Sequence, residues 1–197
     1  MGKAFSEDER EAIRIKLLES AMDLFHENGK KSLSIRELTR RAGISQGGFY
    51  TFWEDKDALI LDLIRYRVSQ KLEAIVPHFA ESLDSPREFL ADHLYYWCID
   101  LKDKIHTRPI YRDSMLQLRR QSAGETNRIS AIYSDFLNDL ADYWYEKHAV
   151  RSVDINGLLN LFAAVGILMS DQVQLDSNYF DELLRILING GVERFII

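Results

Sequence analysis

The sequence predicts an all-α fold of about nine helices, and three observations lead to that prediction. Apolar residues recur every three or four positions along nearly the whole chain of 197 residues. No stretch alternates apolar and polar residues as a strand would, and no two-residue hairpin signal occurs. Hydrophobic residues make up 46% of the chain and charged residues 28%, which is the balance of a well-packed globular protein.

The first two helices are placed by their start signals. Ser6 precedes Glu9 by the spacing of a capping box, so a helix is expected to start at Ser6 and to end at Gly29. Ser34 and Glu37 repeat this spacing and predict the start of a second helix.

A tight turn is expected to follow the second helix. Gly43 can adopt the left-handed conformation there, and Ser45 then caps a short third helix that runs to about Thr51. A fourth helix is predicted from near Asp55 to Pro77, because proline discourages further helix.

Longer helices occupy the rest of the chain. The segment 85–88 combines a serine cap, a proline at the first helical position and a glutamate at the third. Short helices give way to long ones around residues 54–57, which divides the chain into predicted domains 1–56 and 57–197. The expected long helices are 86–105, 109–121, 125–148, 154–173 and 177–197.

Several sequence features bear on the compartment. No apolar run approaches the roughly 18–20 residues that a membrane span requires. Residues 1–6 lack the apolar core of a signal peptide. Cys98 is the only cysteine, so neither a disulfide framework nor a thiolate metal site can form within one chain. We therefore expect a cytoplasmic protein without a membrane partner.

The net charge of −6 is unevenly distributed along the chain. Residues 30–53 hold five basic residues and one acidic residue, whereas the remainder holds 20 basic and 30 acidic residues. A basic segment on an otherwise acidic protein is typical of a local phosphate-facing patch. A solvated surface with chance clustering is the alternative, and it applies in particular to Arg36, Arg40 and Arg41.

Residues 34–51 have the layout of a helix-turn-helix, two short helices joined by a tight turn that contains glycine. In this motif the second helix enters the major groove and presents its first residues to base edges. Gln46 offers a donor and an acceptor suited to adenine, and glycines 47 and 48 let DNA approach the backbone. The hydroxyls of Tyr50 and Thr51 suit phosphate oxygens.

The run 42–59, AGISQGGFYTFWEDKDAL, is similar to the pattern A-G-V-S-x-G-x-x-Y-x-[HY]-F-x-x-K-x-x-L of the TetR family of one-component transcriptional regulators. Residues 34–38 resemble the second helix of that family, and the resemblance covers about residues 10–60. It implies that the chain binds double-stranded operator DNA, mostly through phosphates. The expected DNA-binding residues are Ser34, Arg36, Ser45, Gln46, Gly47, Gly48, Tyr50, Thr51 and Lys56.

Three positions depart from the family pattern. Gly48 stands where threonine or another polar residue is frequent, so one side-chain contact is lost. Phe52 stands where histidine or tyrosine is frequent, and a phenyl ring cannot bond a phosphate. Trp53 replaces the usual phenylalanine as a core anchor beside the fourth helix. Gly48 could instead serve close helix packing, and Lys56 could be an ordinary solvated lysine.

The resemblance also implies that residues 57–197 bind a small-molecule effector. Aromatic side chains are dense in this region, and a pocket of aromatic and apolar groups with a few polar ones suits a small, mainly apolar molecule. The same aromatic residues at helical spacing are also typical of plain core. The candidate ligand-binding residues are His93, Tyr96, Trp97, Tyr111, Met115, Phe136, Trp144 and Phe162.

The last two helices are expected to form a homodimer interface. The helix at 154–173 carries apolar residues together with small ones such as Ala163, Ala164 and Gly166. The final helix is apolar around much of its circumference. Excess apolar surface on two terminal helices is better explained by a partner subunit than by a monomer core.

The sequence gives little support for catalysis. The five histidines, at positions 26, 78, 93, 106 and 148, are scattered and form no H-x-x-x-H ligand pair. P-loop and nucleophile-elbow patterns are absent from the sequence. We expect no catalytic residues, no metal and no cofactor.

Together these features predict a ligand-responsive DNA-binding regulator. We expect a repressor that is released from a palindromic operator by its effector. One alternative is a protein of the same fold that acts as a nucleoid-associated or protein-interaction factor. A second is an all-helical enzyme that uses the aromatic cavity of the C-terminal domain.

Overall fold

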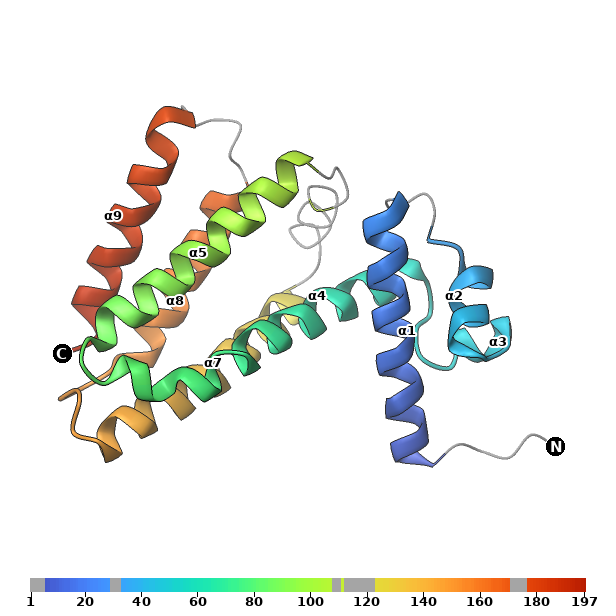
Figure 1. Cartoon of the computed structure of the whole chain (residues 1–197), viewed down its shortest axis with the longest axis horizontal. Coiled ribbons are helices and arrows are strands. Elements are labelled where there is room, and N and C mark those ends of the chain that lie inside the picture. The colour runs from blue at the N-terminus through green and yellow to red at the C-terminus, as the bar shows by residue number, and fades with distance from the viewer. Residues whose placement is uncertain (1–5, 29–32, 108–110, 112–122, 171–176) are drawn as a thin grey trace. The chain divides into compact units, whose positions relative to one another are not determined.

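The computed structural model of the chain describes residues 6–28, 33–107, 111, 123–170 and 177–197. In these residues the only pairing of β type is an isolated bridge between Val153 and Ile196, so the all-α prediction is confirmed (Figure 1). The helices are α1 (Glu7–Asn28), α2 (Ile35–Ala42), α3 (Gln46–Phe49), α4 (Lys56–Glu73), the 3-10 helix η2 (Val76–Ser82), α5 (Pro86–Thr107), α7 (Ala123–Glu146), α8 (Ile155–Ser170) and α9 (Ser177–Phe195).

The chain forms two compact units that divide within α4, between Arg67 and Val68. The first unit contains α1, α2, α3 and the first part of α4. The second contains the rest of α4 and the elements from η2 to α9. The expected change from short to long helices therefore falls in α4, which starts at Lys56.

The expected caps of the first unit are present. The backbone N–H of Ser6 donates to Oε2 of Glu9 at 2.9 Å, and the N–H of Glu9 donates to Oγ of Ser6 at 3.2 Å. This reciprocal capping box satisfies two of the amide groups that the start of a helix leaves without partners. After α2, Gly43 has a φ of 78°, a left-handed conformation that favours glycine.

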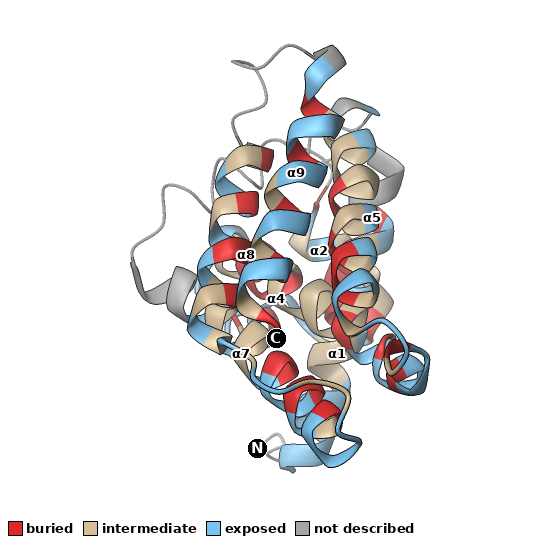
Figure 2. Ribbon diagram, turned by 90° about the vertical axis from the view of Figure 1, so that its left-hand side faces the viewer, coloured by how far each residue is buried: buried red, intermediate tan, exposed pale blue. Residues whose placement is uncertain are grey.

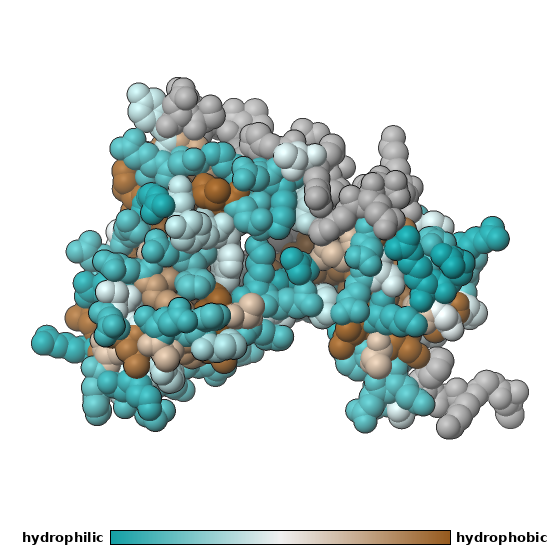
Figure 3. Space-filling model, in the orientation of Figure 1, coloured by the Kyte–Doolittle hydropathy of each residue, from teal (hydrophilic) through white to brown (hydrophobic). Residues whose placement is uncertain are grey.

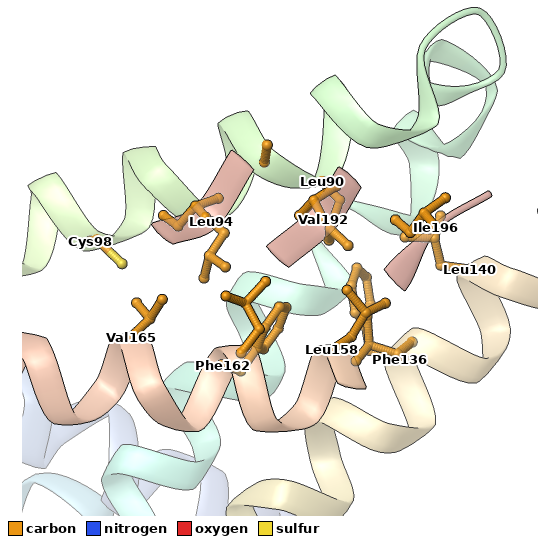
Figure 4. Packing of buried hydrophobic residues seen from close by; sticks show 14 of the residues in the cluster. Leu90, Leu94, Cys98, Phe136, Leu140, Leu158, Phe162, Val165, Val192 and Ile196 are labelled. Carbon is orange, nitrogen blue, oxygen red and sulfur yellow. The ribbon is translucent and has the colours of Figure 1, made fainter. Parts of the chain in front are cut away.

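The core of the second unit lies between its long helices. Figure 4 shows how α5, α7, α8 and α9 contribute to it. Figure 2 shows buried stripes on these helices beside exposed turns, as expected for amphipathic helices. The thiol of Cys98 on α5 is buried, and burial raises its pKa to about 12 against the opposing charge of Lys71. The core residues labelled in Figure 4 include Leu90, Leu94, Phe136, Leu140, Leu158, Phe162, Val165, Val192 and Ile196.

Two helices end before the expected residue, and a third expected helix lies almost entirely outside the described residues. The fourth helix was expected to reach Pro77, but α4 ends at Glu73 and the 3-10 helix η2 follows, with the proline near its start. The final helix was expected to continue to the C-terminus, which is wrong: it ends at Phe195, and the backbone N–H of Ile197 donates to the carbonyl of Ser152 at 2.9 Å. The helix expected over 109–121 lies outside the described residues, except for residue 111.

Two neighbouring glycines of α9 test the packing of this helix on α8. A methyl group at Gly191 would lie 2.6 Å from Cδ1 of Leu161, whereas a methyl group at Gly190 would have no atom within 4 Å. Gly191→Ala should therefore lower the free energy of unfolding by about 1–3 kcal/mol through overpacking. Gly190→Ala should lower it by less, because the added methyl group meets no other atom of the chain and alanine is the better helix former. Urea denaturation measures both, and equal effects would contradict the packing described.

Candidate nucleic-acid interface

The recognition-helix candidate α3 is a single turn of four residues held at both ends. At its start, Oγ of Ser45 accepts a hydrogen bond from the N–H of Gly48 at 3.2 Å. At its end, Phe49 is fully buried. Gln46 faces solvent, and Tyr50, just after the helix, is 59% exposed. The turn thus presents an amide and a phenol outward while one aromatic ring anchors it.

The two glycines of α3 have different surroundings. A methyl group at Gly47 would have only Oγ of Ser45 nearby, at 3.9 Å, so this part of the backbone is open. A methyl group at Gly48 would lie 3.3 Å from Cδ1 of Ile44, tighter than an ordinary contact. Gly47 therefore suits close approach of a ligand to the backbone, and Gly48 also allows close packing on Ile44.

The positive charge on α2 is partly neutralised within the helix. Glu37 accepts from Nε of Arg40 at 2.8 Å and from Nε of Arg41 at 3.0 Å. These hydrogen bonds lower the pKa of Glu37 from 4.5 to about 2. Because the folded-state pKa is the lower one, the pairing stabilises the helix above pH 4.5 and the benefit is lost as the pH falls toward 2. Arg36 is exposed and has no ion pair among the described residues.

The other expected DNA-binding residues lie near α3 in the chain but differ in their bonding. Ser34 caps α2 by accepting from the N–H of Glu37 at 3.4 Å. Thr51 donates its hydroxyl hydrogen to the carbonyl of Gly48 at 2.8 Å, so that hydrogen is already committed. Lys56 is half-buried at the first position of α4. Lys30 and Lys31, which contributed to the basic segment, lie outside the described residues.

Sequence reasoning missed Arg10 and Asp62, which contact the segment after α3, and Arg14, which pairs with Asp62. Arg10 donates from Nη2 to the carbonyl of Thr51 at 2.6 Å. Arg14 and Asp62 form a two-bond ion pair, with distances of 2.9 and 2.8 Å. One signal was available, because Asp62 interrupts the apolar run 59–64 and only 9% of its side chain is exposed. A buried acid must find donors.

The expected effector-binding residues do not share one environment. The ring of His93 is tilted against that of Phe89, with 4.4 Å between centroids, and lies edge-on to Trp97 at 6.4 Å. Trp144 is buried and donates to Oγ of Ser82 at 2.6 Å, while Tyr96 is exposed. Phe136 and Phe162 belong to the core, Tyr111 is half-buried, and Met115 lies outside the described residues.

Tyr133 is a further aromatic candidate that the sequence analysis did not select. Its ring lies edge-on to Phe162 at 5.1 Å between centroids. Burial raises the pKa of its phenol to about 12, so the hydroxyl keeps its proton at neutral pH. The described residues provide no hydrogen-bond partner for this hydroxyl. Its helical spacing is that of an ordinary core residue, which is why periodicity alone could not single it out.

Two further properties concern the described residues only. They contain no group of three or more histidine, cysteine, aspartate or glutamate side chains placed to hold a metal ion. None of their helices combines the length and apolar character needed to cross a membrane.

Comparisons with known proteins show which regulators these features are similar to. Residues 17–63 match the family model described as bacterial regulatory proteins of the tetR family. The chain is 32% identical over 71 residues to the HTH-type transcriptional regulator YuxN of Bacillus subtilis, a match covering 36% of this chain and 24% of that protein. It is 33% identical over 75 residues to BetI, an HTH-type transcriptional regulator of Yersinia pestis, covering 38% of each. The chain thus spans well under half the length of these relatives.

The solved structure of RolR in complex with resorcinol has a similar fold along nearly the whole chain. The TM-score is 0.65 at 18% sequence identity, and the match covers 96% of this chain and 90% of RolR. The family model thus matches residues 17–63 only, whereas the similarity of fold to RolR covers 96% of the chain.

Proposed function

Because residues 17–63 match the tetR family of bacterial regulatory proteins, we propose that the chain is a ligand-responsive DNA-binding transcriptional regulator of this family. The observation that carries this proposal is the Ser45-capped, solvent-facing α3 with Gln46 and Tyr50 exposed, inside the segment 17–63 that matches the family. It acts as a repressor on a palindromic operator. Its DNA-binding domain comprises residues 1–56, and residues 57–197 bind the effector and the second subunit.

The chemistry of the exposed residues divides them between affinity and base choice. Gln46 is the only side chain at the start of α3 with an amide, which can bond an adenine edge in two places. Tyr50 has an exposed hydroxyl for a phosphate. Lys56 and Arg36 supply positive charge for the phosphate backbone, and the open backbone at Gly47 permits close approach. In a dimer, two such helices about 34 Å apart would meet two successive major grooves.

The effector is a small, mainly apolar molecule bound in the C-terminal domain. Support comes from the partly buried rings of Trp97, which lies edge-on to His93, and Tyr133, which lies edge-on to the buried Phe162. The protonated phenol of Tyr133, which has no partner among the described residues, can donate a hydrogen bond to an acceptor atom of the effector. Effector binding then favours a dimer state whose α3 helices have another spacing, with a coupling of about 1–3 kcal/mol.

The dimer forms through α8 and α9. Ile167 on α8 is 68% exposed, and Ile186 on α9 is 61% exposed. Tyr179 and Leu183 are also exposed and share one side of α9 with Ile186, because they are spaced by four and three residues. Figure 3 shows apolar atoms on the surface at α9. Covering this side with the same side of a second subunit gives a two-fold four-helix interface.

Selection from a random pool of duplexes tests the DNA-binding proposal. The parent protein should enrich a palindrome, whereas enrichment of no sequence would favour a nucleoid-associated role instead.

Two substitutions test the division between affinity and base choice on the enriched duplex and its single-base variants. Lys56→Ala should weaken binding to all of these duplexes alike. The salt slope, which is the slope of the log binding constant against log salt concentration, should become less steep by about 0.9. Gln46→Ala should cost about 1–3 kcal/mol on the selected site and relax one base position per half-site. If Gln46→Ala instead weakens every single-base variant equally, the glutamine contacts phosphate.

Thermal unfolding tests the class of effector. Neutral benzene, phenol and naphthalene should raise the melting temperature of the protein, because a ligand that binds only the folded state stabilises it. Benzoate and phthalate are matched charged controls and should not raise it. The neutral compounds should also release the enriched duplex. Stabilisation by the charged compounds alone would contradict a mainly apolar effector, and stabilisation by none would exclude small aromatic molecules.

The dimer proposal is tested by Ile186→Glu, which would place a charge inside the interface. Light scattering should report a monomer with its helical circular dichroism retained. Val76→Glu is the matched control, because Val76 on η2 is 49% exposed but lies outside α8 and α9. This control should remain a dimer. A dimer that survives Ile186→Glu unchanged would remove this side of α9 from the interface.

A further inference from the structure

The recognition-helix candidate cannot hold its own shape. It has only four residues, and two of them are glycines, the residue with the largest backbone entropy to lose. A helix this short makes too few hydrogen bonds to offset the cost of starting it. Whatever fixes the direction of Gln46 and Tyr50 must therefore come from outside α3.

The segment after α3 is held from two other helices. Trp53 is buried, and its indole Nε1 donates to Oδ2 of Asp62 on α4 at 3.0 Å. Asp62 is in turn held by Arg14 on α1, with distances of 2.9 Å from Nε and 2.8 Å from Nη2, and by Arg65 at 3.1 Å. The Trp53 ring lies 5.6 Å from that of Phe49, the buried anchor of α3. Contacts thus lead from α1 through α4 to the end of α3.

A second contact acts on the same segment. Arg10, one helical turn before Arg14 on α1, donates to the carbonyl of Thr51 and lies over the ring of Phe52 at 5.1 Å. Phe52 therefore provides the face for a cation–π contact. The departure from the family pattern at this position replaces a phosphate contact by an internal one.

We propose that Trp53, Asp62, Arg14 and Arg10 are positioning residues for DNA recognition, which fix the orientation of α3 without touching DNA themselves. This inference rests on the proposed DNA-binding function. The positioning role depends in particular on the indole N–H of Trp53, which a phenylalanine at this position would lack. That donor makes the buried Asp62 part of the support of α3.

The charges around Asp62 are consistent with this arrangement. Burial alone would raise the pKa of Asp62, but the hydrogen bonds and charge of Arg14, the N–H of Trp53 and the charge of Arg65 outweigh burial and lower it. Asp62 therefore remains an ionised acceptor at neutral pH. Any loss of the Trp53 donor leaves the ion pair with Arg14 in place, so the support of α3 can be weakened without breaking the unit.

The experiment uses two chemically matched substitutions in the full-length protein. Trp53→Phe removes the indole N–H that donates to Asp62 and keeps an aromatic ring. Trp144→Phe removes an indole N–H that is also buried and donates to Oγ of Ser82 at 2.6 Å, within the core of the other unit and outside the effector contacts proposed above. Both variants lose one buried hydrogen bond, so a general effect on stability is common to the two.

Two measurements then separate positioning from stability. On the duplex enriched by the parent protein, Trp53→Phe should weaken binding about five- to tenfold with the salt slope unchanged. Trp144→Phe should change binding less than about twofold. Without DNA, amide hydrogen exchange should become about tenfold faster at Gly48, Thr51 and Phe52 in Trp53→Phe, while the amides of α5 keep the parent rate.

Arg10→Ala provides a second variant that does not threaten the core, because Arg10 is exposed. It should accelerate exchange at the same three amides. Unchanged exchange in both Trp53→Phe and Arg10→Ala would overturn the proposal, as would equal loss of DNA binding in Trp53→Phe and Trp144→Phe. If the parent protein enriches no duplex, the proposed function fails, and the exchange measurement still decides whether these residues hold α3.

Discussion

Burial of Phe49 is the constraint on which the exposed surface of α3 depends. It is the only buried residue of α3, which is a single helical turn of four residues, two of them glycines. Its neighbours are arranged around that ring: Tyr50 is edge-on at 5.3 Å, and Trp53 is at 5.6 Å. Because the next residue in the chain is outward-facing, the depth at which Phe49 sits determines how far Tyr50 projects. The groups that α3 exposes at the surface are therefore positioned by packing on the opposite side of the turn.

Local signals predicted much of the first unit, and their physical basis explains why. The caps at Ser6, Ser34 and Ser45 act within three residues, and the left-handed conformation of Gly43 depends on the backbone of that residue alone. Interactions across long sequence separations were not predictable in this way. The Arg14–Asp62 pair joins residues 48 positions apart, and pattern alone could indicate only that the buried acid needed donors.

The second unit illustrates the same distinction at a larger scale. Helical periodicity placed its long helices, because each buries one side against the others. Periodicity cannot distinguish an aromatic residue that fills the core from one that lines a ligand site, since both face inward. Trp144, bonded to Ser82, and Tyr133, whose hydroxyl has no partner among the described residues, have the same kind of sequence signal. The C-terminal end differed because its last residues pair with the backbone near Val153.

The state of Cys98 has a practical consequence for measuring motion in this protein. It is the only cysteine in the sequence, it is buried, and burial raises the pKa of its thiol to about 12. Thiol-directed reagents react with the thiolate, which is scarce at neutral pH for such a group. A cysteine introduced at an exposed position can thus carry a spin label or fluorophore without removal of the native one. Distances from such a label then become accessible in the otherwise unaltered chain.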